Sequence, residues 1–233
     1  MNADNSRILV LWDIDNTLLY TGGAGSLAMA RAFHDLYGIP DAFRRVEFSG
    51  RTDTAIFRDA ALAHGVAADR LDDEMARFRD AYVPRLAAAL REVEGGRLMP
   101  GSREILQALD GHDAVTQALG TGNLRRGAEL KLRHFEIDAF FPGTPGGFGE
   151  DSHDRHEVIR IAIERMSNGA RPDRIIVIGD TPHDVTAARA NGAFALAVAT
   201  GRDSTDDLRA SGADIALDDL PDVEAALRII CAA

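Results

Sequence analysis

The sequence predicts an α/β fold, a doubly wound parallel sheet (a Rossmann-like core) that is interrupted by an inserted helical cap. Two observations carry this prediction. Short apolar runs that read as strands alternate along most of the chain with amphipathic stretches that read as helices, as in a parallel sheet that is covered on both faces. Directly after the first apolar run, this alternation gives way to a long helical block without a buried strand.

The first expected strand is the almost continuous apolar run Arg7–Asp13, which ends in acids. Further runs of this kind, the last of them weaker, predict the other strands of the sheet. These runs cover residues 114–121, 174–180, 193–200 and 213–217. The amphipathic stretches that predict the helices between them cover residues 102–109, 126–134, 154–166 and 183–191.

The helical block follows the first strand. Its helical patterns cover residues 26–37, 53–64 and 69–90. The pairs Gly22-Gly23 and Gly95-Gly96 bracket the block, as flexible hinges would. We therefore expect an α/β catalytic core made of residues 1–20 and 97–233, with residues 21–96 forming a helical cap.

The composition narrows the classes of partner. The 233-residue chain has a net charge of −11, whereas nucleic acids and anionic membranes both require a positive surface. Cys231 is the single cysteine, which excludes internal disulfides and cysteine-based zinc sites. Met1–Arg7 is polar and no apolar run approaches the roughly 18 residues of a membrane span. We therefore expect a cytoplasmic protein that binds neither nucleic acid nor membrane, and the oligomeric state stays open.

Lysine is almost absent. Lysine and arginine together number 26, and Lys131 is the only lysine, so any reaction that needs a lysine must use this one. A P-loop needs Gly-Lys-Ser/Thr at the end of its glycine-rich turn, but Lys131 stands between two leucines. P-loop NTPases are therefore excluded.

Polar side chains follow several expected strands at the point where each strand ends. Because ligands bind outside the carboxyl ends of parallel strands, we expect these side chains to gather at one edge of the sheet. Clustered carboxylates repel one another unless a cation neutralises them, and hard oxygen ligands favour Mg²⁺. A carboxylate in such a cluster can attack phosphorus, while a second one protonates the leaving oxygen and later activates water. The residues are Asp13, Asp15, Thr121, Gly122, Asn123, Asp180 and Asp184, with Lys131 within reach.

These residues resemble the four motifs of the haloacid dehalogenase-like hydrolase superfamily. The motifs occur in the family's order between residues 13 and 184, and the helical block matches the helical-cap, phosphoglycolate-phosphatase-like subgroup. The resemblance implies a phosphoric monoester hydrolase, namely a Mg²⁺-dependent phosphatase that hydrolyses a small phosphorylated metabolite through an aspartyl-phosphate. The matching segments are Asp13-Ile-Asp15-Asn-Thr17, Thr121-Gly-Asn123, Lys131 and Gly179-Asp180-Thr-Pro-His-Asp184.

The resemblance also implies a role for each residue. Asp13 matches the nucleophile and a metal ligand, and Asp15 matches the general acid/base, whose backbone carbonyl also binds the metal. Asp180 and Asp184 match the remaining metal-binding acids. The phosphoryl-binding turn is matched by Thr121, Gly122 and Asn123, and the charge-neutralising lysine by Lys131. Trp12 and Asn16 stand where Phe and Gly are commoner, and neither change removes a reacting group.

Alternatives remain within and outside the family. Asp15 argues against a dehalogenase, which lacks an acid there, and the lysine-free cap excludes a phosphonatase. A phosphomutase uses the same acid pair and stays an alternative. A phospho-acceptor signalling protein is an alternative from another class, although receiver domains carry no cap. The phosphate ester itself is left open.

Three other segments allow two interpretations each. In Ser49–Asp53, Thr52 or Asp53 can cap a helix, while Arg51 can reach the site and hold an anionic end of the substrate. Gly23–Ala28 resembles a dinucleotide fingerprint, but no second strand follows, so we interpret it as the hinge. Gly143–Gly149 reads as a flexible rim loop. In the segment after it, His153 and His156 are interpreted as a solvated helix start rather than a zinc site, and the role of residues 143–157 is left open.

Overall fold

A computed structural model describes residues 7–231. Residues 1–6 of the segment Met1–Arg7, on which part of the localisation argument rests, lie outside the described residues. Among residues 7–231, no helix combines the length and the apolar character that crossing a bilayer requires.

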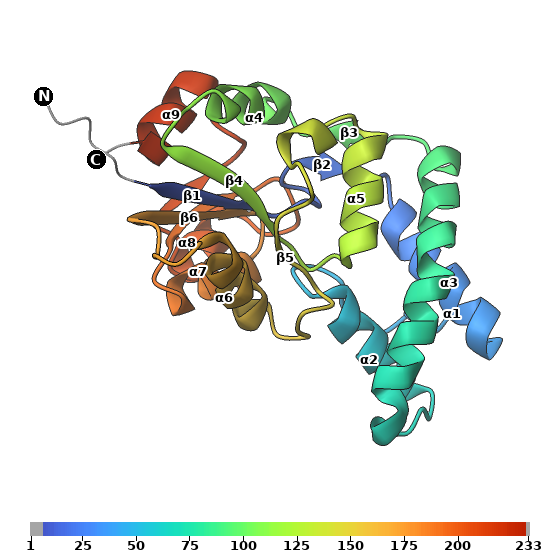
Figure 1. The fold of residues 1–233 in the computed structure, drawn as a ribbon. Helices are drawn as coiled ribbons and strands as arrows, with labels where there is room; N and C mark the ends of the chain where they lie inside the picture. Colours follow the sequence, from blue (N-terminus) through green and yellow to red (C-terminus); the bar gives the residue numbers. More distant parts are fainter. Residues whose placement is uncertain (1–6, 232–233) are drawn as a thin grey trace, which may run out of the picture.

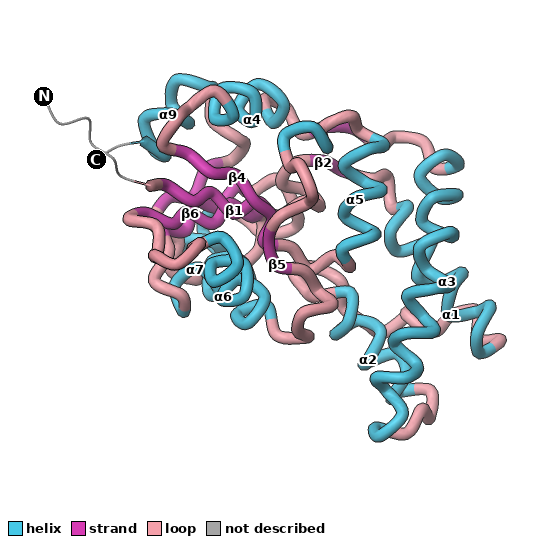
Figure 2. The backbone as a smooth tube through the Cα atoms, in the orientation of Figure 1, coloured by secondary structure: helices cyan, strands magenta, loops and turns pink. Residues whose placement is uncertain are grey.

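The core of the fold is a parallel sheet of six strands in the order β5-β4-β1-β6-β7-β8, with helices on both faces (Figures 1 and 2). The doubly wound α/β class predicted from the sequence is therefore confirmed. The strands are β1 (Ile8–Trp12), β4 (Val115–Gly120), β5 (Gly146–Gly147), β6 (Arg174–Gly179), β7 (Phe194–Val198) and β8 (Ile215–Leu217).

β1 explains why the strands read as continuous apolar runs. Its five residues are all buried, because their side chains alternate between two covered faces. Val10 and Trp12 belong to one apolar cluster, with helices α4 (Ser102–Asp110) and α9 (Val223–Cys231). Leu9 and Leu11 belong to another, with α6 (Arg155–Met166), α7 (Pro182–Ala190) and α8 (Thr205–Ala210).

The short edge strand β5 departs from the sequence prediction of a flexible loop over Gly143–Gly149. Gly146 and Gly147 are buried and pair with β4 at Leu119 and Gly120. A Cβ on Gly146 would lie 2.0 Å from the carbonyl oxygen of Leu119, and one on Gly147 would lie 2.2 Å from that of Val158. Only glycine permits this close approach, and two glycines carry no hydrophobic pattern that would reveal a strand.

The segment between the first and second sheet strands, residues 21–96, is called the helical insertion below. It contains α1 (Ala24–Tyr37), α2 (Asp53–Ala63), a short 3₁₀ helix (Ala68–Arg70) and α3 (Leu71–Glu92). Their apolar faces form a separate cluster around Phe33, Phe57 and Phe78. The antiparallel pair β2 (Leu19–Tyr20) and β3 (Arg97–Leu98) brings its two ends together.

The helical insertion contacts the sheet domain in two places that position the site. Helix α3 packs against α5 (Arg125–His134), where a Cβ on Gly127 would lie 3.3 Å from the ring of Tyr82. At the start of α2, the Asp53 N–H donates to the carbonyl oxygen of Gly122 over 2.7 Å. A Cβ on Gly122 would lie 2.4 Å from the carbonyl oxygen of Arg51. The start of α2 therefore rests directly on the turn that follows β4.

Candidate active site

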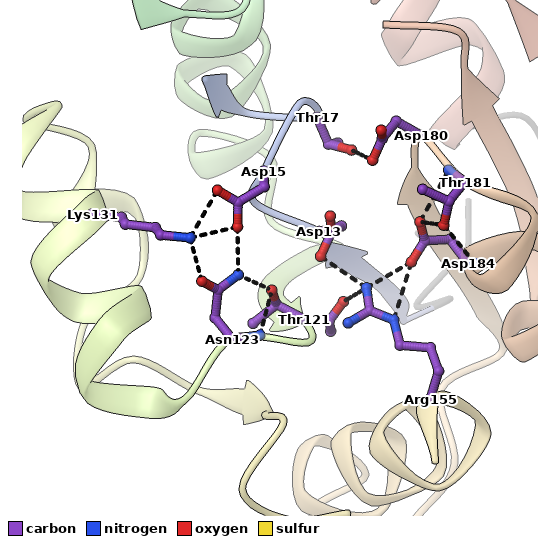
Figure 3. Close-up of polar contacts among 11 residues, drawn as sticks. Asp13, Asp15, Thr17, Thr121, Asn123, Lys131, Arg155, Asp180, Thr181 and Asp184 are labelled. Carbon is purple, nitrogen blue, oxygen red and sulfur yellow. Dashed lines mark hydrogen bonds and ion pairs between the residues drawn. The ribbon is translucent and has the colours of Figure 1, made fainter. Parts of the chain in front are cut away.

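A cavity of about 580 Å³ lies between the carboxyl ends of the strands and the helical insertion. The sheet contributes Asp13, Asp15 and Asp180 to its wall. Gly122 and Asn123 line the same cavity. The strand ends that were expected to meet therefore do meet, and the close-up in Figure 3 shows their side chains facing one another.

Three carboxylates form the floor of this site. Asp13 follows β1 and its N–H donates to the carbonyl oxygen of Ile178 over 2.9 Å, which holds it beside β6. Asp180 directly follows β6, and Asp184 lies in the first turn of α7. One oxygen from each of these three carboxylates lies within 4.8 Å of the other two. Within residues 7–231, this is the one grouping of acids, histidines or cysteines with the spacing of a metal site.

Asp184 combines a structural and a charged contact. Its Oδ2 accepts hydrogen bonds from the backbone N–H and the hydroxyl of Thr181, at 3.2 and 2.7 Å. This completes a capping box at the start of α7, which fixes the side-chain rotamer. The other oxygen, Oδ1, is turned toward the remaining acids and accepts from Arg155. Capping the helix and serving the site are therefore compatible in this residue.

Asp180 is the least satisfied of the three acids. It is buried, and its Oδ1 accepts only a long 3.5 Å hydrogen bond from the Thr17 hydroxyl. Its Oδ2 has no hydrogen-bond partner among the described residues. Burial, followed by the negative charges of Asp184, Asp13 and Asp15, raises the pKa of Asp180 well above its usual value. A buried carboxylate oxygen without a partner needs a cation or a proton, so the donor set fits Mg²⁺.

Arg155 is a residue of the candidate site that the sequence motifs do not reveal. It begins α6, is 6% exposed, and donates to Asp13 Oδ1 over 2.8 Å and to Asp184 Oδ1 over 2.6 Å. The same nitrogen also donates to the carbonyl oxygen of Gly120. Arg155 is thus the cation between the candidate nucleophile and its acidic neighbour (Figure 3).

The sequence does contain a signal for Arg155. The buried residues of α6 are Arg155, Val158, Ile159, Ala162 and Ile163, which is the spacing of one apolar helix face. An arginine at the first position of that face is almost never buried unless it is paired. Residues 143–157, whose role the motifs leave open, therefore deliver a cation to the floor of the site.

The charges around Asp13 oppose one another. Burial is the largest influence and raises its pKa to about 6. The positive charge of Arg155 acts in the opposite direction, and the negative charges of Asp184 and Asp15 raise the pKa further. A carboxylate must be ionised to act as a nucleophile, so Arg155 favours the reactive form of Asp13.

Lys131 makes its contacts on the other side of the site. It is 3% exposed, and its Nζ lies 2.6 and 2.8 Å from the two oxygens of Asp15 and 2.5 Å from Asn123 Oδ1. The Asn123 amide donates to Asp15 Oδ2 and to the Thr121 hydroxyl, both over 2.8 Å. The resemblance implies that Lys131 is the charge-neutralising lysine. In the structure it bonds Asp15, whereas Arg155 bonds Asp13.

The remaining predicted residues differ in their access to the cavity. Gly122 and Asn123 line it, while Thr121 is fully buried with its hydroxyl bonded to Asn123. Arg51 also lines the cavity, but its guanidinium already pairs with Asp59 over 2.5 Å. The φ angle of Asn16 is +59°, in the left-handed region that Asn and Gly tolerate best, which explains the substitution for glycine.

Comparisons with known proteins show which proteins this chain resembles. The family model described as haloacid dehalogenase-like hydrolase matches residues 10–189. The phosphoglycolate phosphatase of Pseudomonas putida is 25% identical over 217 residues, covering 91% of this chain and 76% of the relative. Pyrophosphatase PpaX of Bacillus velezensis is 25% identical over 226 residues, covering 95% and 96%.

The fold is also shared with solved structures. A hydrolase from Pseudomonas syringae superposes with a TM-score of 0.68 at 19% identity, covering 97% of this chain and 99% of the other. The family model spans the strand-end acids, the helical insertion and α7. The chain belongs to the haloacid dehalogenase-like hydrolase family.

Proposed function

We propose that this hydrolase is a Mg²⁺-dependent phosphatase that cleaves a small phosphorylated metabolite through an aspartyl-phosphate on Asp13. The observation that carries the proposal is the triad of buried carboxylates at the floor of the cavity, one of which has an oxygen without a partner. Two phosphatase relatives that cover most of the chain support the reaction class.

The metal would be held by Asp13, Asp180 and Asp184, and by the backbone carbonyl of Asp15. When bound, Mg²⁺ would neutralise the acids and polarise a phosphoryl oxygen. The remaining contributions come from side chains of this chain.

In the first step an Asp13 carboxylate oxygen attacks phosphorus, and the bond from phosphorus to the ester oxygen breaks. Asp15 donates a proton to that leaving oxygen, so the product departs as an alcohol. In the second step Asp15 takes a proton from water, the water oxygen attacks phosphorus, and the bond to Asp13 breaks. Inorganic phosphate is released and both carboxyl groups return to their starting states.

The cations and the turn after β4 hold these groups in place. Arg155 bonds Asp13 Oδ1 and supplies the compensating charge that the resemblance assigns to Lys131. Lys131 bonds both oxygens of Asp15 and so fixes the direction of the acid/base. We assign contact with the phosphoryl oxygens to Thr121, Gly122 and Asn123.

We also propose that residues 21–96 act as a cap that excludes water and selects the substrate. The hydrogen bond from Asp53 to Gly122 supports this, because it joins the insertion to the phosphoryl-binding turn. Arg51 stays a candidate contact for an anionic part of the substrate, which would have to compete with Asp59 for the guanidinium.

The test measures phosphate release by the purified protein. We expect Mg²⁺-dependent hydrolysis of phenyl phosphate, loss of activity with EDTA, and loss of activity in Asp13→Asn. Undiminished turnover by Asp13→Asn would refute the mechanism. Transfer of the phosphoryl group to a second hydroxyl without phosphate release would identify a phosphomutase, and a phospho-enzyme that persists for minutes would identify a signalling protein.

A further inference from the structure

Two buried polar groups line the cavity without a role in the chemistry above. Asp53 is 8% exposed and Tyr82 is 1% exposed, and both belong to the helical insertion. Both therefore belong to the insertion's side of the cavity, where Asp53 borders the turn that follows β4.

Asp53 has one oxygen free for a ligand. Its Oδ2 accepts from the backbone N–H of Leu124 over 2.8 Å, whereas Oδ1 has no hydrogen-bond partner among residues 7–231. Capping of α2 is done by the Thr52 hydroxyl, which accepts from the N–H of Ala55. Burial raises the pKa of Asp53 to about 6, against the opposing charge of Lys131. Oδ1 is not among the fully buried atoms without a partner, so it is open to the cavity and can accept a hydrogen bond from a ligand.

Tyr82 offers the complementary hydroxyl. Its ring is fixed within α3 by stacking on Phe78, with ring centroids 5.9 Å apart. No described residue forms a hydrogen bond with the hydroxyl, and it is not among the fully buried atoms without a partner, so it is open to the cavity. The negative charge of Asp53 acts on this hydroxyl and, after burial, is the next cause of its raised pKa. The phenol and the carboxylate thus line the same cavity, from α3 and from the start of α2.

The lining of the cavity also includes apolar side chains. Met29, Phe48 and Ile56 line the same cavity. Sugars and polyols present C–H groups together with hydroxyls that both donate and accept. Such molecules match a wall on which one acceptor and one phenol stand among apolar side chains.

We propose that Asp53 and Tyr82 form a subsite for hydroxyl groups, and that the substrate is the phosphate ester of a polyol or sugar. A substrate hydroxyl donates to Asp53 Oδ1, and a hydroxyl oxygen accepts from the Tyr82 phenol. This assignment rests on the proposed phosphatase activity and specifies its substrate class.

Charge separates this class from two other kinds of phosphate ester. A substrate carboxylate beside Asp53 would add a negative charge where those of Asp15 and Asp13 already raise the Asp53 pKa. An ammonium group would pair with Asp53 but cannot accept from Tyr82, and it would lie near the positive charge of Lys131. A neutral hydroxyl avoids both conflicts.

The experiment compares kcat/KM for four esters with the full-length protein and Mg²⁺. The esters are sorbitol 6-phosphate, 2-phosphoglycolate, O-phosphoethanolamine and phenyl phosphate. We expect sorbitol 6-phosphate to exceed the carboxylate and ammonium esters at least about 100-fold, the range over which a site with hydrogen-bonding groups discriminates. A preference for either charged ester over sorbitol 6-phosphate would overturn the proposal.

Two variants assign the preference to the subsite. Asp53→Asn keeps an acceptor for the Leu124 N–H but presents an amide donor to the cavity, and we expect it to lower kcat/KM for sorbitol 6-phosphate about 10- to 100-fold. The same variant should raise kcat/KM for 2-phosphoglycolate. Tyr82→Phe removes only the hydroxyl and should cost about 10-fold on the polyol ester. Asp73→Asn, an exposed position on α3, is the matched control and should leave all four values unchanged.

The outcomes separate the subsite from the reaction itself. If Asp53→Asn and Tyr82→Phe each change all four esters by one common factor, their roles are structural and the subsite is refuted. If phenyl phosphate is cleaved without preference for the polyol ester, the subsite is also refuted while the phosphatase assignment stands. If none of the four esters is cleaved by the wild-type protein, the phosphatase assignment fails, and the subsite with it.

Discussion

Replacing Asp53 by asparagine should stabilise the protein at neutral pH and do so less in acid. Burial raises the pKa of Asp53 from 3.8 to about 6, so the folded state holds its proton more tightly than the unfolded chain does. The ionised carboxylate therefore costs folding free energy above the folded pKa, and this cost disappears as the pH falls toward the unfolded pKa. Asparagine is neutral throughout and carries no such cost.

The size of the effect follows from the shift. The difference between the ordinary pKa of 3.8 and the folded-state pKa of about 6 corresponds to a cost in folding free energy. Ionised Asp53 costs about 3 kcal/mol at pH 7.5 and about half of that at pH 5. For a protein of this length, each kcal/mol moves the melting temperature by about 2–4 °C. Asp53→Asn should therefore melt higher than wild type by about 6–12 °C at pH 7.5, and by about half as much at pH 5.

The assay is thermal denaturation of wild type, Asp53→Asn and the control Asp73→Asn in metal-free buffers between pH 5 and pH 7.5. Comparing the melting temperatures of the two variants at the same pH cancels the effect of titratable groups that both proteins contain. Asp73 is exposed, so its variant should stay within about 0.5 kcal/mol of wild type. A gap between Asp53→Asn and wild type that is absent, or that is independent of pH, would show that the carboxylate carries no ionisation cost. A residue that lowers stability in this way is typical of a position retained for function.

Four further predictions concern the floor of the site and the contact with the insertion. Arg155→Met leaves two buried carboxylates uncompensated and should lower the unfolding free energy by roughly 3–5 kcal/mol in metal-free urea titrations; a loss below about 1 kcal/mol would contradict the pairing. Lys131→Arg should lower kcat at least about ten-fold, because Nζ meets its three acceptors in a space too small for a guanidinium; a near-normal kcat would refute this. Gly122→Ala places a Cβ 2.4 Å from the Arg51 carbonyl oxygen, so it should cost about 1–3 kcal/mol and raise KM; unchanged melting would mean that the insertion moves freely. Finally, Mg²⁺ should raise the melting temperature of wild type more than that of Asp180→Asn; equal shifts would argue against Asp180 as a ligand.

The sequence predicts the sheet and its acidic edge well because both depend on local chemistry. A strand such as Ile8–Trp12 is buried on both faces, and this burial requires an uninterrupted apolar run that can be read directly. The acids that follow such runs must then share one edge of the sheet. The strand at Gly146–Gly147 has no such signature, since its glycines are required by the backbone of Leu119 and Val158, which is distant in sequence.

The contacts of the two buried cations, Lys131 and Arg155, could not be predicted from the local sequence. Both Lys131 and Arg155 follow β4, and motif order alone makes Lys131 the charge-neutralising residue. Which of the two reaches Asp13 depends on how the helices that carry them are packed. Helix α5 packs against α3 of the insertion, and Lys131 therefore bonds Asp15. Helix α6 packs against β1 and β4 and directs Arg155 to Asp13. Neither packing arrangement is encoded at the residues that make the contact.

The different contacts of Lys131 and Arg155 have a chemical reason. Asp13, the proposed nucleophile, has the acidic neighbour Asp184, and Arg155 donates to Asp184 from two nitrogens while one of them also bonds Asp13. The single nitrogen of an ammonium cannot make this two-nitrogen contact. In the proposed reaction Asp15 changes its protonation state, and a compact ammonium can bond both of its oxygens while leaving them close to the cavity. Lys131 is the one lysine among 26 lysines and arginines. It lies where a compact ammonium fits, and Arg155 lies where a planar guanidinium fits. Lys131→Arg and Arg155→Lys should each impair the proposed reaction, for opposite geometric reasons. In Lys131→Arg the larger guanidinium does not fit, and in Arg155→Lys one contact is lost.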